Sequence, residues 1–112
     1  MVMEIVLDGT PVGPDYPPFV IAECGHNHLG STEECNRLFR MAGAAGVDAV
    51  KLQKRDNAAL YTRSFFDSPY NSENSYGPTY GTHREAHEFS FGQYQELQEE
   101  AADLGISFFA TP

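Results

Sequence analysis

Two segments of the chain share one helical pattern, and each is followed directly by an apolar run. The first segment starts at Ser31 and stops at Gly46, and the second starts at Ser90 and stops at Gly105, 15 positions on in both cases. Serine is a favoured helix N-cap, a Glu or Gln stands three residues later as in a capping box, and glycine suits the position after a helix. A repeated unit of strand and helix predicts a parallel sheet with right-handed crossovers.

Apolar side chains recur at helical spacing in both segments, so each helix is expected to bury one face. These faces are Cys35, Leu38, Ala42 and Ala45 in the first helix and Tyr94, Leu97, Ala101 and Leu104 in the second. The apolar runs at 19–24, 47–53 and 106–111 are predicted as strands. The first run is unbroken until its carboxylate, which is typical of a strand buried on both faces.

The repeat also divides the chain. We predict a hairpin over residues 1–14, with a turn at Asp8-Gly9, then a first βαβ unit over 19–53. Residues 54–89 form a long loop on the active-site side, and residues 90–112 supply the second helix and the third strand. The loop holds four of the six Tyr. Loops of this length in a compact domain are usually functional or disordered, and the aromatic content favours function.

Polar side chains stand near the carboxyl end of each predicted strand. They are Glu23, Lys51 with Gln53, and Thr111. Active sites of parallel α/β proteins lie at this edge of the sheet. A buried charge without a partner costs free energy, so a charged residue at a strand end is expected to have a partner or a function. Glu23 and Lys51 could therefore form a structural ion pair, line an active site, or do both. Lys51, one of only two lysines, suits either an anionic substrate or a Schiff base, and the residues alone leave both open.

Four histidines raise the question of a metal site. His26 and His28 lie in the loop after Glu23, where loop hydrogen bonding is the first expectation and active-site lining the second. His83 and His87 are four apart in HREAH, which is not the HExxH arrangement of zinc proteases, and we expect them to face solvent. Cys24 is expected to pack as a small hydrophobe on the face opposite Glu23.

The composition excludes several functions. The formal charge is −9 without a basic stripe, so nucleic-acid binding is not expected. No apolar run is long enough for a membrane span, and the start lacks the features of a signal peptide. With only two cysteines, the chain is expected in the cytoplasm with reduced thiols.

Three motifs resemble the sialic acid synthase (NeuB) family. The run IAECGHNHLG from Ile21 to Gly30 resembles its IAEIGxNHxG signature. The run AAGVDAVKLQ, ending at Gln53, resembles AGADAVKFQ, and GISFFATP, ending at Pro112, is similar to GIxFxSTPF. The resemblance covers the chain from about residue 19 and implies a (β/α)₈ TIM barrel, of which this would be the N-terminal portion.

The resemblance also implies a reaction. Members of the family condense phosphoenolpyruvate with an N-acetylated amino sugar, such as N-acetylmannosamine, to give a nine-carbon ulosonic acid and phosphate. A divalent metal, Mn²⁺ or Mg²⁺, activates the aldehyde, and its two histidine ligands match none of the four histidines here. No metal ligand is therefore assigned to this chain. The segment from Asn74 to Ser90 departs from the best-known members and leaves the acceptor sugar open.

The same resemblance assigns roles to individual residues. Lys51 and Thr111 match positions that hold phosphoenolpyruvate, and Glu23 matches a glutamate that handles protons and orients water or the sugar. Gln53 matches a position that contacts the sugar. An Asn of the 54–89 loop also reaches the sugar, with Asn74 preferred over Asn71.

The length conflicts with a complete barrel, which takes about 250 residues. We therefore expect a truncated chain that is inactive alone, belonging to an enzyme that forms homo-oligomers. Two alternatives stay open: a non-catalytic βα module that self-associates through its sheet edges, and a Schiff-base aldolase that uses Lys51.

Overall fold

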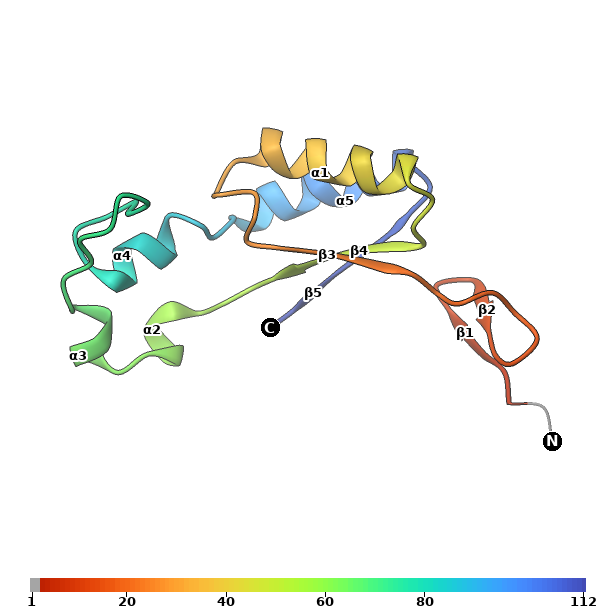
Figure 1. The fold of residues 1–112 in the computed structure, drawn as a ribbon, viewed down its shortest axis with the longest axis horizontal. Coiled ribbons are helices and arrows are strands. Elements are labelled where there is room, and N and C mark those ends of the chain that lie inside the picture. The colour runs from red at the N-terminus through yellow and green to blue at the C-terminus, as the bar shows by residue number, and fades with distance from the viewer. Residues whose placement is uncertain (1–2) are drawn as a thin grey trace.

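The computed structural model describes residues 3–112, and its centre is a three-stranded parallel sheet. The strands β3 (Ile21–Gly25), β4 (Ala49–Gln53) and β5 (Ser107–Thr111) lie side by side in chain order. Helices α1 (Thr32–Ala44) and α5 (Phe91–Asp103) connect them and pack together on one face of the sheet (Figure 1). The predicted repeat of strand and helix is confirmed.

The ends of both helices follow from their sequences. Ser31 and Ser90 are the N-caps, and each accepts a hydrogen bond from the backbone three residues on. Of these two helices, only α5 completes the capping box, with Ser90 N donating to the Gln93 side chain. In α1 the Glu34 carboxylate accepts from Arg37 instead. The capping box predicted for α1 is therefore only half formed, because a neighbouring guanidinium takes the second half.

The core lies between the sheet and the two helices. Its buried members are Cys24, Cys35, Phe39, Val50, Leu52, Phe89, Leu97 and Ala101. Burial raises the pKa of the Cys35 thiol to about 12 and also raises that of Cys24, so both thiols are unreactive. Ala45 is exposed, contrary to prediction, because it is the C-cap beyond the last turn of α1.

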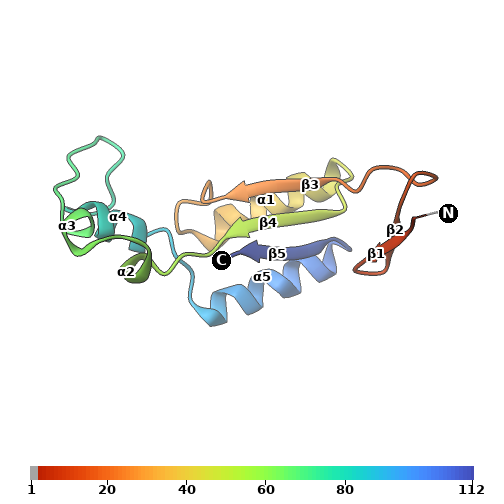
Figure 2. The ribbon, with the colours of Figure 1, turned by 90° about the horizontal axis from the view of Figure 1, so that it is seen from below.

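The opposite face of the sheet carries no helix in residues 3–112 (Figure 2). Ile21 is 45% exposed and Phe109 is 42% exposed on this face. The prediction that the first strand is buried on both faces is therefore wrong for this chain, because helices cover only the face that carries Cys24.

The hairpin lies at the amino-terminal end of the sheet. Its strands β1 (Ile5–Leu7) and β2 (Thr10–Val12) pair antiparallel across Asp8-Gly9, as predicted. Asp8 accepts a hydrogen bond from Ser107 at 2.5 Å, which fixes the hairpin to the start of β5. Residues 1 and 2, also assigned to the hairpin from the sequence, lie outside the described residues.

The segment 54–89 lies at the carboxyl-terminal end of the strands (Figure 1). It contains three short helices, α2 (Asn57–Leu60), α3 (Arg63–Phe66) and α4 (Tyr80–Glu85), so a loop without secondary structure is the wrong description. Aromatic contacts join them, with Tyr61 and Tyr80 rings 5.2 Å apart and Phe65 and Tyr80 rings 4.7 Å apart. None of the helices within residues 3–112 is long and apolar enough to cross a membrane.

Candidate active site

Three polar side chains meet at the carboxyl ends of β3 and β4. The Lys51 Nζ donates to both carboxylate oxygens of Glu23, at 3.0 and 3.2 Å. The Gln53 Nε2 donates to Glu23 Oε1 at 3.3 Å. The ion pair, one of the alternatives left open by the sequence, is therefore present, and Gln53 belongs to the same cluster.

The strand register places this cluster on the uncovered face. Glu23 pairs with Lys51, which pairs with Phe109, and aligned residues of parallel strands point to the same side. Gln53 pairs with Thr111 in the same way. Cys24 lies on the helix side, as predicted. The four residues singled out at the strand ends thus share one face and one edge of the sheet.

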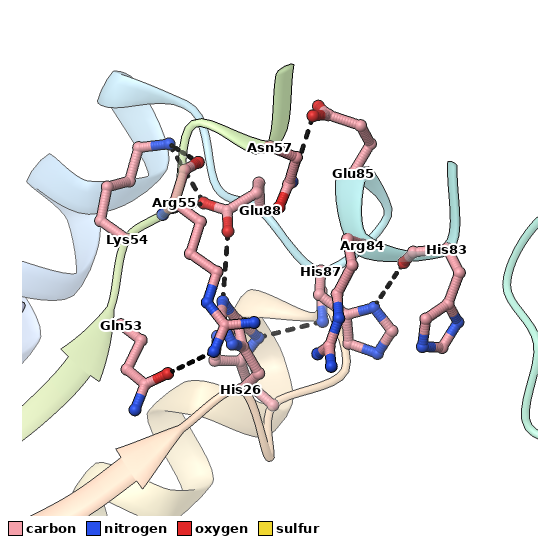
Figure 3. Close-up of polar contacts among 12 residues, drawn as sticks. His26, Gln53, Lys54, Arg55, Asn57, His83, Arg84, Glu85, His87 and Glu88 are labelled. Carbon is pink, nitrogen blue, oxygen red and sulfur yellow. Dashed lines mark hydrogen bonds and ion pairs between the residues drawn. The ribbon is translucent and has the colours of Figure 1, made fainter. Parts of the chain in front are cut away.

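Arg55 extends the cluster away from the sheet. Its Nη2 donates to Gln53 Oε1 at 3.0 Å (Figure 3). The Gln53 amide therefore bridges the Glu23 carboxylate and the Arg55 guanidinium. Arg55 and Gln53 also line an open cleft of about 640 Å³, together with Lys54, Asp56, Tyr61 and Thr111 among others. The cleft has a cationic wall beside the last residues of β4 and β5.

Glu88, which no sequence motif singled out, connects this region to the loop after β3. Its carboxylate, 9% exposed, accepts from His26 Nε2 at 3.2 Å, from Lys54 Nζ at 3.1 Å and from the Arg55 backbone at 3.3 Å. The hydrogen bond between His26 and Glu88, drawn in Figure 3, joins positions 62 residues apart. Only the fold of the 54–89 segment brings these groups together.

Both histidines of the loop after β3 form hydrogen bonds, His26 with the Glu88 carboxylate and His28 with the Gly30 backbone. His28 is 1% exposed, stacks on Phe89 with rings 4.1 Å apart, and accepts a hydrogen bond from Gly30 N. Burial, with smaller contributions from His26 and His87, lowers the pKa of His28 to about 4. Loop hydrogen bonding, the first expectation for these histidines, is confirmed.

The second pair of histidines is buried, although it was expected to face solvent. His83 is 8% and His87 5% exposed, and their rings lie 4.7 Å apart. His83 Nδ1 accepts from Tyr76 N, and His87 Nδ1 bonds the His83 carbonyl oxygen. The aromatic side chains of the 54–89 segment cover this pair, and composition alone did not indicate that. Burial lowers the pKa of His83, with His87 and Arg84 adding to the effect.

The asparagines of the long segment occupy different environments. Asn74 and Asn71 lie in the exposed connection between α3 and α4, at the end of the molecule away from the sheet (Figure 2). Asn74 N bonds the Ser72 hydroxyl. Neither Asn has a hydrogen bond to Glu23, Lys51 or Gln53 within residues 3–112. Asn57 is instead 1% exposed and donates to Glu85.

The described part of the chain has no group of three His, Cys, Asp or Glu side chains placed to hold a metal ion. We therefore assign no metal ligand to these residues and derive no step through a metal.

Comparisons with known proteins found related sequences over nearly the whole chain. The sequence model of the NeuB family matches residues 38–112. The chain belongs to the NeuB family. Among individual relatives, the N-acetylneuraminate-9-phosphate synthases of Homo sapiens and Mus musculus are 42% and 41% identical over 99% of this chain. The chain spans 31% of the length of each.

A solved structure extends the likeness from sequence to fold. The N-acetylneuraminic acid (sialic acid) synthetase from Leptospira borgpetersenii, crystallised in complex with citrate, aligns with the whole of this NeuB-family chain. The TM-score is 0.75 at 27% identity, and the alignment covers 35% of the synthetase. The parallel α/β fold is therefore similar to the N-terminal part of a sialic acid synthase.

Proposed function

We propose that this chain supplies part of the active site of a sialic acid synthase-like enzyme. The enzyme condenses phosphoenolpyruvate with an N-acetylated amino sugar to give a nine-carbon ulosonic acid and phosphate. The observation that carries the proposal is the cluster of Glu23, Lys51 and Gln53 at the carboxyl ends of adjacent strands. Proteins with the same fold can catalyse different reactions, and the residues of the site decide which one. The cluster is therefore stronger support for the proposed reaction than the fold is.

We also infer that the sheet is the first part of a (β/α)₈ barrel. Three observations support this: the strands neighbour one another in chain order, the helices lie on one face, and the opposite face carries the polar cluster. In such barrels the inner face of the sheet holds the strand ends that carry chemistry. Glu23 and Lys51 would then point to the mouth of the barrel.

Lys51 and Thr111 would hold phosphoenolpyruvate. An ammonium suits its phosphate or carboxylate, and a hydroxyl at the neighbouring strand end supplies a further donor. Among the described side chains, Glu23 alone accepts hydrogen bonds from Lys51 Nζ. An entering anion would share this ammonium with Glu23, so the ion pair keeps the cation in place before the substrate binds.

Glu23 would handle protons during the condensation. The methylene carbon of phosphoenolpyruvate forms the new bond to the aldehyde carbon of the sugar, whose oxygen takes up a proton. Water then adds to the former enol carbon and loses a proton, and the bond from that carbon to the phosphate oxygen breaks. Glu23 lies within hydrogen-bond distance of both Lys51 and Gln53, so one carboxylate would face both substrates.

Gln53 would contact the acceptor sugar, and the exposed Asn74 stays a weaker candidate for the same role. The two relatives are named for a product phosphorylated at position 9. Sugars with and without a phosphate therefore both fall in the proposed acceptor class. The divalent cation, the homo-oligomer and the cytoplasmic location stay predictions of the sequence.

The test is phosphate release by the full-length protein as it is encoded. We expect release of phosphate from phosphoenolpyruvate only when an N-acetylated amino sugar and Mn²⁺ are both present, with a nine-carbon acid as product. A Schiff-base aldolase would instead give a borohydride-stable adduct of Lys51 with pyruvate, detected by mass spectrometry. Trapping of that adduct without sugar-dependent phosphate release would overturn the proposal.

A further inference from the structure

Two guanidiniums beside the strand-end cluster have no carboxylate partner. Five of the seven basic side chains form ion pairs: Arg37, Arg40, Lys51, Lys54 and Arg63. Within residues 3–112, Arg55 and Arg84 form none, although the chain carries a net charge of −9. Both side chains are half-buried, where an uncompensated charge is costlier than on an open surface.

The two arginines lie close together through a pair of tyrosines. Arg55 Nη1 donates to the Tyr61 hydroxyl at 3.5 Å, and Arg84 Nε donates to the Tyr80 hydroxyl at 2.9 Å. The Tyr61 and Tyr80 rings are 5.2 Å apart, and the Arg84 guanidinium lies over the Tyr80 ring. Figure 3 shows both guanidiniums on the same side of the polar network, near His26.

The charges of Arg55 and Arg84 both act on the His26 side chain. Burial lowers the pKa of His26 and the charges of Arg55 and Arg84 lower it further, while Glu88 opposes them. Both guanidinium charges therefore act on the same imidazole, in a protein that is acidic overall. Two neighbouring guanidiniums without a carboxylate partner among the described residues favour an anionic ligand.

Three carboxylates of the same region have other hydrogen-bond partners. Asp56 lines the cleft but accepts from the Ala59 backbone as the N-cap of α2. Glu85 accepts from Asn57, and Glu88 accepts from His26, Lys54 and the Arg55 backbone. None of them forms an ion pair with the guanidinium of Arg55 or of Arg84.

The guanidiniums keep free donors for a ligand. A guanidinium has five N–H groups, of which Arg55 uses two and Arg84 one in the described contacts. Paired N–H donors in this planar arrangement match the oxygens of a phosphate monoester. Arg55 also donates to Gln53, on the side of that amide away from Lys51 and Glu23. A phosphate bound there is separate from the phosphate of phosphoenolpyruvate at Lys51.

We propose that Arg55 and Arg84 form a second anion site, which binds a phosphate monoester on the acceptor sugar and selects phosphorylated acceptors. The inference rests on the proposed function, because it takes Gln53 as the contact to the sugar. It names two residues, neither of them matched to a family motif, as the determinants of acceptor choice.

The test compares two acceptors in the full-length protein. We expect kcat/KM for N-acetylmannosamine 6-phosphate to exceed that for N-acetylmannosamine, and Arg55→Gln to lower the ratio of the two at least tenfold. Arg84→Lys, which keeps the charge but loses the paired N–H donors, should lower the ratio as well. Arg63→Gln is the matched control, because Arg63 is exposed and paired with Asp67 on α3. A ratio that stays within twofold of wild type in Arg55→Gln overturns the proposal.

Equilibrium binding separates this proposal from the proposed function. Calorimetric titration with the sugar phosphate, the unphosphorylated sugar and inorganic phosphate needs no turnover. Tightest binding of the sugar phosphate, weakened by Arg55→Gln, supports the site even if no condensation occurs. Equal affinity for inorganic phosphate and sugar phosphate, or no effect of Arg55→Gln, overturns it.

Discussion

The Lys51 ammonium lies 3.0 Å from one carboxylate oxygen of Glu23 and 3.2 Å from the other. The two residues are 28 positions apart and are aligned by the register of β3 and β4. Exposed ion pairs contribute little to stability, about 0 to 1 kcal/mol, and Glu23 is half exposed. Stability alone therefore gives a weak reason for placing these charges at the strand ends, and substrate handling gives a stronger one.

Replacing Glu23 by Gln tests its role with the protons. The amide keeps the size and can accept a hydrogen bond from Lys51, but it cannot take a proton. We expect kcat to fall on the order of 100-fold or more, with the KM for phosphoenolpyruvate changed far less. Steady-state kinetics of the full-length protein measures both constants.

Glu100→Gln serves as the control for that variant, since Glu100 pairs with Arg40 on the helix layer. An increase in KM with kcat unchanged in Glu23→Gln would show that Glu23 only binds substrate.

Gly30, in the loop after β3, faces the backbone of Ala86 at the end of α4. Its φ is +79°, and a Cβ there would meet the Ala86 carbonyl oxygen far inside van der Waals contact. Gly30→Ala should therefore lower the free energy of unfolding by about 3 kcal/mol or more, through both strain and clash. Chemical denaturation measures this change.

Gly46→Ala is the matched control, because Gly46 has φ +85° but no atom within 4 Å of its Cβ position. Gly46→Ala should lower the free energy of unfolding by about 1 to 2 kcal/mol, because it adds backbone strain without a clash. Equal losses in the two variants would contradict the close packing of the loop against α4.

The burial of His28 predicts that the stability of the protein depends on pH. Its pKa is about 4 in the folded protein and near its ordinary value of 6.5 in the unfolded chain, so below pH 6.5 the unfolded chain binds a proton first. The contribution of neutral, buried His28 to the free energy of unfolding is complete above pH 6.5 and is lost as the pH falls toward 4. Between pH 7.5 and 4.5 the loss from this residue is about 2 to 3 kcal/mol.

His28→Asn removes the titration and keeps an acceptor near Gly30 N. Its free energy of unfolding, measured by denaturation at several pH values, should fall less on acidification than that of the wild type. An unchanged difference between pH 7.5 and 4.5 would contradict the buried, neutral state of His28.

Local signals were enough to predict the sheet and its two long helices. The serine caps, Gly46 and Gly105 act within a few residues, so they fix where α1 and α5 begin and end. Strand alternation likewise placed Glu23, Lys51, Gln53 and Thr111 at one edge. These features depend on short-range chemistry and on one rule of parallel sheets.

Contacts across the long segment could not be predicted in this way. Glu88 reaches His26 and Lys54 only because α2, α3 and α4 fold the chain back toward the sheet. The burial of His83 and His87 depends on aromatic packing among the same helices. Arg55 and Arg84 become a pair for the same reason, since no sequence spacing links positions 55 and 84.

Lys51 offers the most direct test of the strand-end active site. The measurement is kcat/KM for phosphoenolpyruvate in the full-length protein and its Lys51→Ala variant, with Arg40→Ala as a control on the helix layer. We predict a loss on the order of 100-fold or more for Lys51→Ala, because it removes the cation that faces the phosphate, and none beyond twofold for the control. Unchanged kinetic constants in Lys51→Ala, in a protein that folds normally, would contradict the assignment.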